Sequence, residues 1–184
     1  VPFMGGGFGG KDDCPVTGPA IMLALKCGRP VKIVQTREEV FSSGQPRPSA
    51  TIYVTDAYNK DGTLAARRVK AFVNCGAYTT SALVMLDHIV YGVSGNYRNP
   101  CLLVDAYGIY TNTQFNGPYR ALGCELFVYA IERNLDTAAE MLGISKHEIR
   151  RRNVLHLGDV DGHGQVVTSN GSAEALEAAA KYIR

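Results

Sequence analysis

The sequence has little net charge, no membrane-length apolar run and no internal repeat, and each absence narrows the functions open to it. Its 19 basic and 17 acidic residues give a formal charge of +2. This balance gives no reason to expect nucleic acid or an anionic membrane as the main partner. No apolar segment is long enough to cross a bilayer, and no signal peptide is recognisable. We therefore expect a cytoplasmic protein.

Paired cysteines are also missing. The five cysteines are odd in number and widely spaced, and no C-x-x-C occurs, which argues against a disulfide framework or a zinc site. The 184 residues, 46% of them hydrophobic and 20% charged, suit one soluble globular domain. Only four residues precede the first glycines, and the last helical pattern reaches Arg184 without a stop signal. We expect residues 1–184 to be one partial domain, truncated at both ends.

The first two thirds of the chain carry mostly strand and loop patterns. Pro19 suits a first helical turn, and Gly28 followed by Pro30 ends that helix. The sequence "NKDG" lies between two predicted strands and predicts a hairpin turn. The predicted segments are a helix at 19–27, a strand at 31–37, a loop at 44–49, hairpin strands at 50–58 and 63–73, and a strand at roughly 102–112.

Helical patterns dominate the last third. Apolar residues recur at helical spacing over 127–142. Ser145 and Glu148 have the spacing of a capping box, Ser172 is positioned to cap a final helix, and the Arg150–Arg152 run indicates a solvated helix face. Strands and helices come in blocks rather than in alternation. This favours an α+β fold, with a mixed or antiparallel sheet that contains a hairpin and has helices packed on it.

The glycine-rich opening "VPFMGGGFGGKDD" matches two phosphate-binding patterns. Gly5, Gly10 and Lys11 fit G-x-x-x-x-G-K, but that loop needs Ser or Thr after the lysine, and Asp12 stands there. The dinucleotide pattern G-x-G-x-x-G needs a buried strand before it, and too few residues precede the glycines. What remains is a run of main-chain amides with few side chains around them. They suit either an anionic or oxo-bearing ligand or a tight structural turn.

Four stretches, taken together, resemble one protein family. They are "GGGFGGK" followed by "GRPVKIVQTREEV", "CGAYTT" at 75–80, "YTNTQFNGPYRALG" at 110–123, and "LGISKHEIRRRNVL" with "GDVDGHGQVV". In order and spacing they are similar to the molybdopterin-binding chain of the xanthine dehydrogenase and aldehyde oxidase family of molybdenum hydroxylases. The resemblance implies that residues 1–184 belong to the first molybdopterin-binding domain, without the second cofactor domain.

The resemblance implies an oxidoreductase that hydroxylates an N-heterocycle or an aldehyde with oxygen derived from water. Molybdenum would be held by the dithiolene of a molybdopterin, in a dinucleotide form, and by no protein ligand. Iron–sulfur clusters and FAD would lie on partner subunits or domains, beside the remainder of the molybdenum chain. Because the family's general base lies outside these residues, the stretch alone should be inactive. The alternative is a non-catalytic scaffold that keeps the fold without the cofactor.

Residues of two loops match the family's cofactor site. The resemblance assigns cofactor contact to Gly6, Gly7, Phe8 and Gly9, with the backbone of Phe8 beside the oxo ligand of the metal. Arg120 matches a loop arginine next to the metal centre, where its fixed fork of donors could orient cofactor or substrate oxygens in catalysis. The alternatives are that Phe8 is a core aromatic and that Arg120 is an ordinary surface arginine.

Three further residues match substrate positions of the family. Asp12 aligns with an acidic residue that hydrogen-bonds the substrate ring, or else has only a local role in the loop. His88 aligns with an arginine that stabilises negative charge on purines, or else is an ordinary satisfied histidine. Leu122 replaces a phenylalanine that stacks on the ring, so Leu122 and His88 argue against a xanthine-type pocket. Glu125 also departs from the family, because many relatives have proline there.

Overall fold

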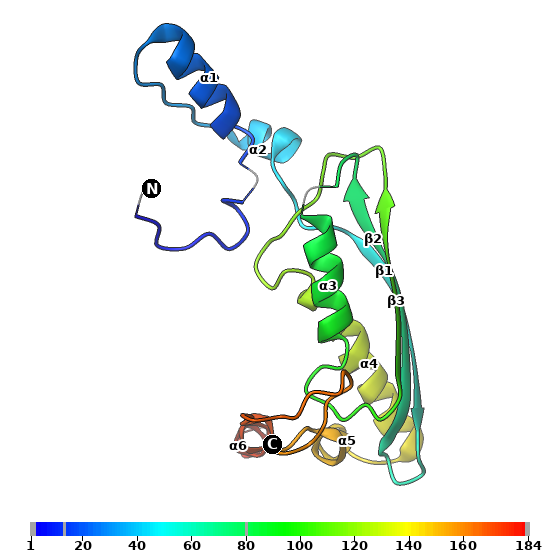
Figure 1. Ribbon diagram of the computed structural model, residues 1–184. Coiled ribbons are helices and arrows are strands. Elements are labelled where there is room, and N and C mark those ends of the chain that lie inside the picture. The colour runs from blue at the N-terminus through cyan, green and yellow to red at the C-terminus, as the bar shows by residue number, and fades with distance from the viewer. Residues whose placement is uncertain (1–2, 13, 80, 183–184) are drawn as a thin grey trace.

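The computed structural model describes residues 3–12, 14–79 and 81–182. A three-stranded sheet has the order β1-β2-β3. Strands β1 and β2 form the antiparallel hairpin predicted from "NKDG", and β3 runs parallel to β2 after a crossover through α3. Helices α3 and α4 cover one face of this mixed sheet (Figure 1), which confirms the predicted α+β class. The bounds are β1 Ala50–Tyr58, β2 Leu64–Gly76, β3 Leu102–Tyr110 and α3 Ala82–Gly92.

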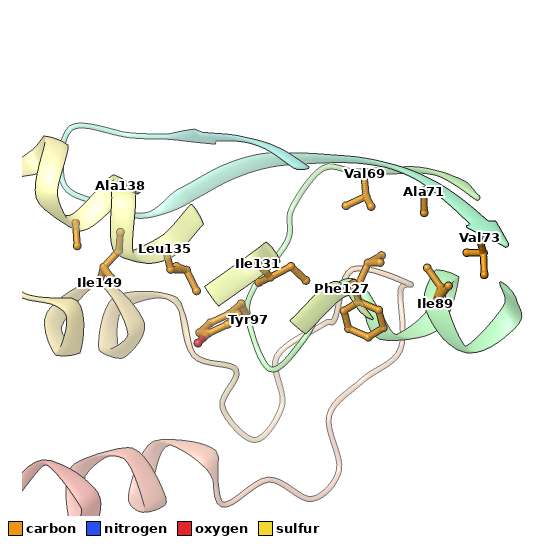
Figure 2. Close-up of a cluster of buried hydrophobic side chains, with 12 residues drawn as sticks. Val69, Ala71, Val73, Ile89, Tyr97, Phe127, Ile131, Leu135, Ala138 and Ile149 are labelled. Atoms are coloured by element: carbon orange, nitrogen blue, oxygen red, sulfur yellow. The ribbon is translucent and has the colours of Figure 1, made fainter. Parts of the chain in front are cut away.

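The core lies between the sheet and the two helices that cover it. Val69, Ala71 and Val73 point inward from alternate positions of β2 and are fully buried. They pack against Ile89 of α3 and against one apolar face of α4 (Cys124–Leu142), as Figure 2 shows. The sequence periodicity predicted a face of Phe127, Ile131, Leu135, Ala138 and Leu142; the first four are buried, Leu142 is half-buried, and Ala139 is buried in addition.

Two shorter helices lie at the end of the molecule opposite the N-terminal segment (Figure 1). They are α5 (Lys146–Asn153) and α6 (Ser172–Ala180). Ser145 caps α5 as predicted, since its Oγ accepts a hydrogen bond from the backbone N–H of Glu148 at 3.0 Å. Ser172 does not cap α6. It is the first helical residue, with Gly171 at the cap position, and its own N–H donates to Oδ1 of Asn170 at 2.8 Å.

The N-terminal helices project away from the body that carries the sheet (Figure 1). They are α1 (Thr17–Cys27), which matches the predicted helix at 19–27, and α2 (Arg37–Ser43). Neither helix has a buried residue. Even the large apolar side chains Met22, Leu25 and Phe41 are 68%, 75% and 73% exposed. A helix that is apolar on several sides is ordinarily covered. The two helices therefore carry an apolar surface that no other described part of this chain covers.

The predicted strand at 31–37 is wrong. Residues 31–36 pair with no strand in the part of the chain that the structure describes, and Arg37 begins α2. A capping box decides this start: Thr36 Oγ1 accepts from the N–H of Glu39 at 3.2 Å, and Glu39 Oε2 accepts from the N–H of Thr36 at 2.7 Å. A run of β-branched residues makes a strand only where a neighbouring strand supplies hydrogen bonds, and no strand of the described residues pairs with this segment.

The arginine run of α5 is more than the solvated face predicted from the sequence. Arg150 donates to the carboxylate of Glu132 on α4 at 2.6 Å, and its side chain is only 19% exposed. Arg152 donates to the backbone oxygen of Asp61 in the hairpin turn. The run therefore joins α5 to α4 and to the β1–β2 hairpin. Only Arg151 fits the prediction, because it pairs with Glu148 on its own helix surface.

Glu148 makes the stability of this end of the molecule sensitive to acid. Hydrogen bonds from Arg151 and then Arg152 hold the pKa of Glu148 at about 2, below the ordinary 4.5. A carboxyl whose pKa is lower in the folded state stabilises the fold above pH 4.5, and this contribution is lost as the pH falls toward 2.

We expect Glu148→Gln to lower the urea midpoint at pH 6, with the difference from the unmodified protein shrinking between pH 4.5 and 2. Glu174→Gln on α6 is the control. An equal difference at every pH would contradict the expectation.

Candidate functional site

The glycine loop forms a tight turn at the surface. Phe8 and Gly9 both have positive φ, at 52° and 88°, and the N–H of Gly10 donates to the oxygen of Gly7 at 3.0 Å. Within the described residues, the N–H groups of residues 6–9 donate to no protein acceptor. Phe8 is 68% exposed, so it does not belong to the core formed by the described residues. The loop thus offers several main-chain donors to a ligand.

The structure brings this loop against the second loop that the sequence singled out. The N–H of Arg120 donates to the backbone oxygen of Phe8 at 2.9 Å. The Arg120 guanidinium lies 5.8 Å from the centre of the Phe8 ring. Gly9 allows this approach, since a Cβ built there would lie 2.0 Å from the backbone oxygen of Pro118. Within the described residues the Arg120 guanidinium makes no hydrogen bond or ion pair, so its donors are available.

Hydrogen bonds at the ends of β2 and β3 hold the loop that carries Arg120 (residues 110–123). Oδ1 of Asn74 accepts from the N–H of Gly76 at 2.9 Å and from Oγ1 of Thr111 at 2.6 Å. Nδ2 of Asn116 donates to the oxygen of Asn74 at 3.0 Å. Gly76, with φ 74°, lets the loop pass close: a Cβ there would lie 2.0 Å from the oxygen of Gln114. Sequence reasoning missed Asn74, because an asparagine at a strand end gives no distinctive pattern.

The three predicted substrate residues lie at different places around this contact. Asp12 is exposed at the end of the glycine loop, and Leu122 is half-buried in the turn after Arg120, with φ 51°. His88 is exposed on α3, where its Nδ1 lies 2.7 Å from the backbone oxygen of Val84. Helix α3 supports the turn, because a Cβ on Gly123 would lie 3.1 Å from the oxygen of Met85. Within the described chain, no hydrogen bond or ring contact joins His88 to Arg120.

The cysteines near the site are not built as metal ligands. All five are free thiols in this structure. Burial and then the Glu125 carboxylate raise the pKa of Cys124, and burial raises the pKa of Cys75, so both remain thiols. In the described ranges no three His, Cys, Asp or Glu side chains gather as a metal site would need. Bare amides beside a guanidinium fit instead a group that brings its own metal ligands together with oxo or phosphate oxygens.

Comparisons with known proteins identify the family of the chain. The model of the molybdopterin cofactor-binding domain matches residues 1–154. A probable xanthine dehydrogenase subunit of Bacillus subtilis is 37% identical over 179 residues, which cover 97% of this chain and 24% of the relative. The nicotinate dehydrogenase large molybdopterin subunit of Eubacterium barkeri is 32% identical over 176 residues, which cover 95% of this chain and 41% of the relative.

Solved structures show the same fold. Quinoline 2-oxidoreductase from Pseudomonas putida 86 superimposes with a TM-score of 0.92 at 27% identity, over all of this chain and 24% of that one. The chain thus spans about a quarter of the Bacillus relative and of this structure. Because the family model covers most of the sequence and the relatives extend over nearly all of it, the chain belongs to the molybdopterin cofactor-binding domain family of the xanthine dehydrogenase-like molybdenum hydroxylases.

Proposed function

We propose that residues 1–184 form part of the first molybdopterin-binding domain of an enzyme that hydroxylates an N-heterocycle or an aldehyde with water-derived oxygen. The contact between Phe8 and Arg120 is the observation that carries this proposal. It places unused main-chain donors and an unpaired guanidinium side by side, from loops far apart in the sequence. When bound, the molybdenum–pterin group supplies the redox chemistry, and the protein supplies orientation and electrostatics.

Each residue of the contact has a distinct role in this proposal. The N–H groups of Gly6, Gly7, Phe8 and Gly9 donate to oxo or phosphate oxygens of the cofactor. A Cβ on Gly7 would meet only Cβ of Lys11, at 3.7 Å, so the protein itself leaves room at that position. Gly7 then gives clearance toward the ligand rather than toward the fold. The Arg120 guanidinium orients oxygens through its planar fork and stabilises negative charge that develops there.

We propose that Asp12, His88 and Leu122 contact the substrate, around the place where Phe8 and Arg120 meet. Asp12 follows the glycine loop, Leu122 follows Arg120, and His88 lies on the helix that supports the turn. The names of similar proteins include nicotinate and quinoline, which are N-heterocycles. An N-heterocycle is therefore the substrate class that we favour, with an aldehyde as the second.

The apolar surface of α1 and α2 supports the proposed partners. Its exposed side chains include Met22, Leu25 and Phe41, which an isolated surface helix rarely leaves uncovered. We propose that the remaining part of the molybdenum chain covers this surface. Iron–sulfur and flavin subunits or domains, carrying FAD, would accept the electrons, and the pterin would be in a dinucleotide form in a cytoplasmic complex. A scaffold that keeps the fold without cofactor is the alternative.

Arg120→Ala in the assembled full-length protein tests the proposal. Loss of one donor from a charge-stabilising site lowers turnover by roughly 10²-fold or more. We expect this loss with purine, nicotinate-like or aldehyde substrates, with a melting temperature close to that of the unmodified protein. Arg133→Ala is the matched control, because Arg133 is an exposed arginine on α4. Metal analysis of the unmodified protein gives the second readout.

Two results would count against the proposed function. Turnover that is unchanged in Arg120→Ala would remove Arg120 from the site. A well-folded, assembled protein that contains no molybdenum would favour the scaffold.

A further inference from the structure

The turn that follows Arg120 has a backbone conformation that must be held in place. Ala121, Leu122 and Gly123 all have positive φ, at 83°, 51° and 98°. Only glycine adopts this region readily, so two consecutive non-glycine residues persist there only where surrounding contacts fix them. Because Arg120 directly precedes this turn, the direction of its side chain depends on the conformation of the turn.

Arg47, in the segment before β1, contacts both sides of this turn. Its Nη2 donates to the backbone oxygen of Arg120 at 2.9 Å, and its Nη1 forms an ion pair with Oε1 of Glu125. Oε2 of Glu125 accepts from the N–H of Gly123 at 3.0 Å. The Arg47 guanidinium also lies 5.0 Å from the centre of the Tyr119 ring. The Arg47–Glu125 pair therefore spans the turn from one end to the other.

These contacts need the shape of the arginine head group. One guanidinium reaches a carbonyl oxygen, a carboxylate and an aromatic face at once, which a single lysine ammonium cannot match. The side chains of Arg47 and Glu125 are only 34% and 25% exposed, so water competes less for these bonds than at an open surface. Together with the bond from its N–H to Phe8, the main chain of Arg120 is held at both its N–H and its carbonyl oxygen.

We propose that Arg47 and Glu125 are positioning residues, which fix the strained turn and so aim the Arg120 guanidinium at the bound molybdenum–pterin group. This inference rests on the proposed function. Arg47 hydrogen-bonds to the backbone oxygen of Arg120 and Glu125 to the backbone N–H of Gly123, and no hydrogen bond within the described residues occupies the Arg120 guanidinium.

Hydrogen exchange at the Arg120 amide tests this in the assembled full-length protein. That N–H bonds to Phe8, so its protection reports how firmly the two loops are joined. We expect Arg47→Met to raise the exchange rate about tenfold, the scale of one lost charge-assisted contact. Arg47→Lys should give a smaller increase, since it keeps the charge without the fork. Arg98→Met is the control, because it removes a comparable ion pair, 2.8 Å from Asp159, elsewhere on the surface.

The ratio of molybdenum to protein supplies the second readout. We expect Arg47→Met and Arg120→Met each to lower it, and Arg47→Met to lower it no further when Arg120 is already methionine. Unchanged exchange at Arg120 in Arg47→Met, or an additive loss in the double variant, would overturn the positioning role and leave the proposed function intact. Absence of molybdenum from every form, including the unmodified one, would overturn the proposed function and with it the purpose assigned to the pair.

Discussion

Replacing Gly9 with alanine is expected to lower the molybdenum content of the assembled protein by about tenfold or more, with only a few degrees of change in melting temperature. The added Cβ would lie 2.0 Å from the oxygen of Pro118 and 2.9 Å from the nitrogen of Tyr119. Both neighbours are backbone atoms, so the two loops must move apart. The φ of 88° at Gly9 adds roughly 1–2 kcal/mol of strain for any residue with a side chain.

The effect should fall on the site rather than on the fold, because Gly9 lies outside the buried core. Gly5→Ala is the matched control in the same loop, since no atom of the described residues lies within 4 Å of a Cβ built there. We expect Gly5→Ala to keep its molybdenum. The hypothesis of a merely structural turn predicts instead that Gly9→Ala loses stability without a separate cofactor defect. Metal analysis and thermal unfolding of the same preparations distinguish these results.

Replacing Arg67 with methionine is expected to give the largest loss of stability. Arg67 and Asp56 form an ion pair across the β1–β2 hairpin, with side chains 0% and 2% exposed and bonds of 2.8 and 2.9 Å. Nη1 of Arg67 also donates to the oxygen of Val93 at the end of α3, at 3.3 Å. Removing one partner leaves a buried carboxylate uncompensated, which costs about 3–5 kcal/mol. For a domain of this size that corresponds to a melting temperature lower by roughly 10 °C.

The adjacent residue provides a close control. Arg68 points to the other face of the sheet, with its side chain 63% exposed and 3.9 Å from Asp105. Such an exposed pair contributes about 0–1 kcal/mol, so Arg68→Met should change the melting temperature little. Replacing Asp56 and Arg67 together with leucine should recover part of the loss, because no lone charge then remains buried. Equal melting temperatures for Arg67→Met and Arg68→Met would contradict this account.

Much of the fold followed from local patterns. The turn "NKDG" predicted the hairpin, the helical spacing over 127–142 predicted the buried face of α4, and Gly28 predicted the end of α1. In each case the decisive forces act between residues close in sequence, so the pattern contains them. The same locality explains the error at 31–37, where strand propensity had no neighbouring strand to satisfy it and the capping box at Thr36 began α2 instead.

The sequence by itself determined the family and the α+β class, and it singled out the two loops of the proposed site. Only the tertiary structure decided how these loops meet. It showed that the Arg120 amide bonds to Phe8, that Gly9 is needed for a close approach whereas a Cβ at Gly7 would make only an ordinary contact with Lys11, and that Arg47 and Glu125 span the turn after Arg120. These facts depend on distances between segments far apart in the chain. A local pattern determines dihedral preferences and the period of burial. Neither of these determines how far apart two distant segments lie in the folded chain.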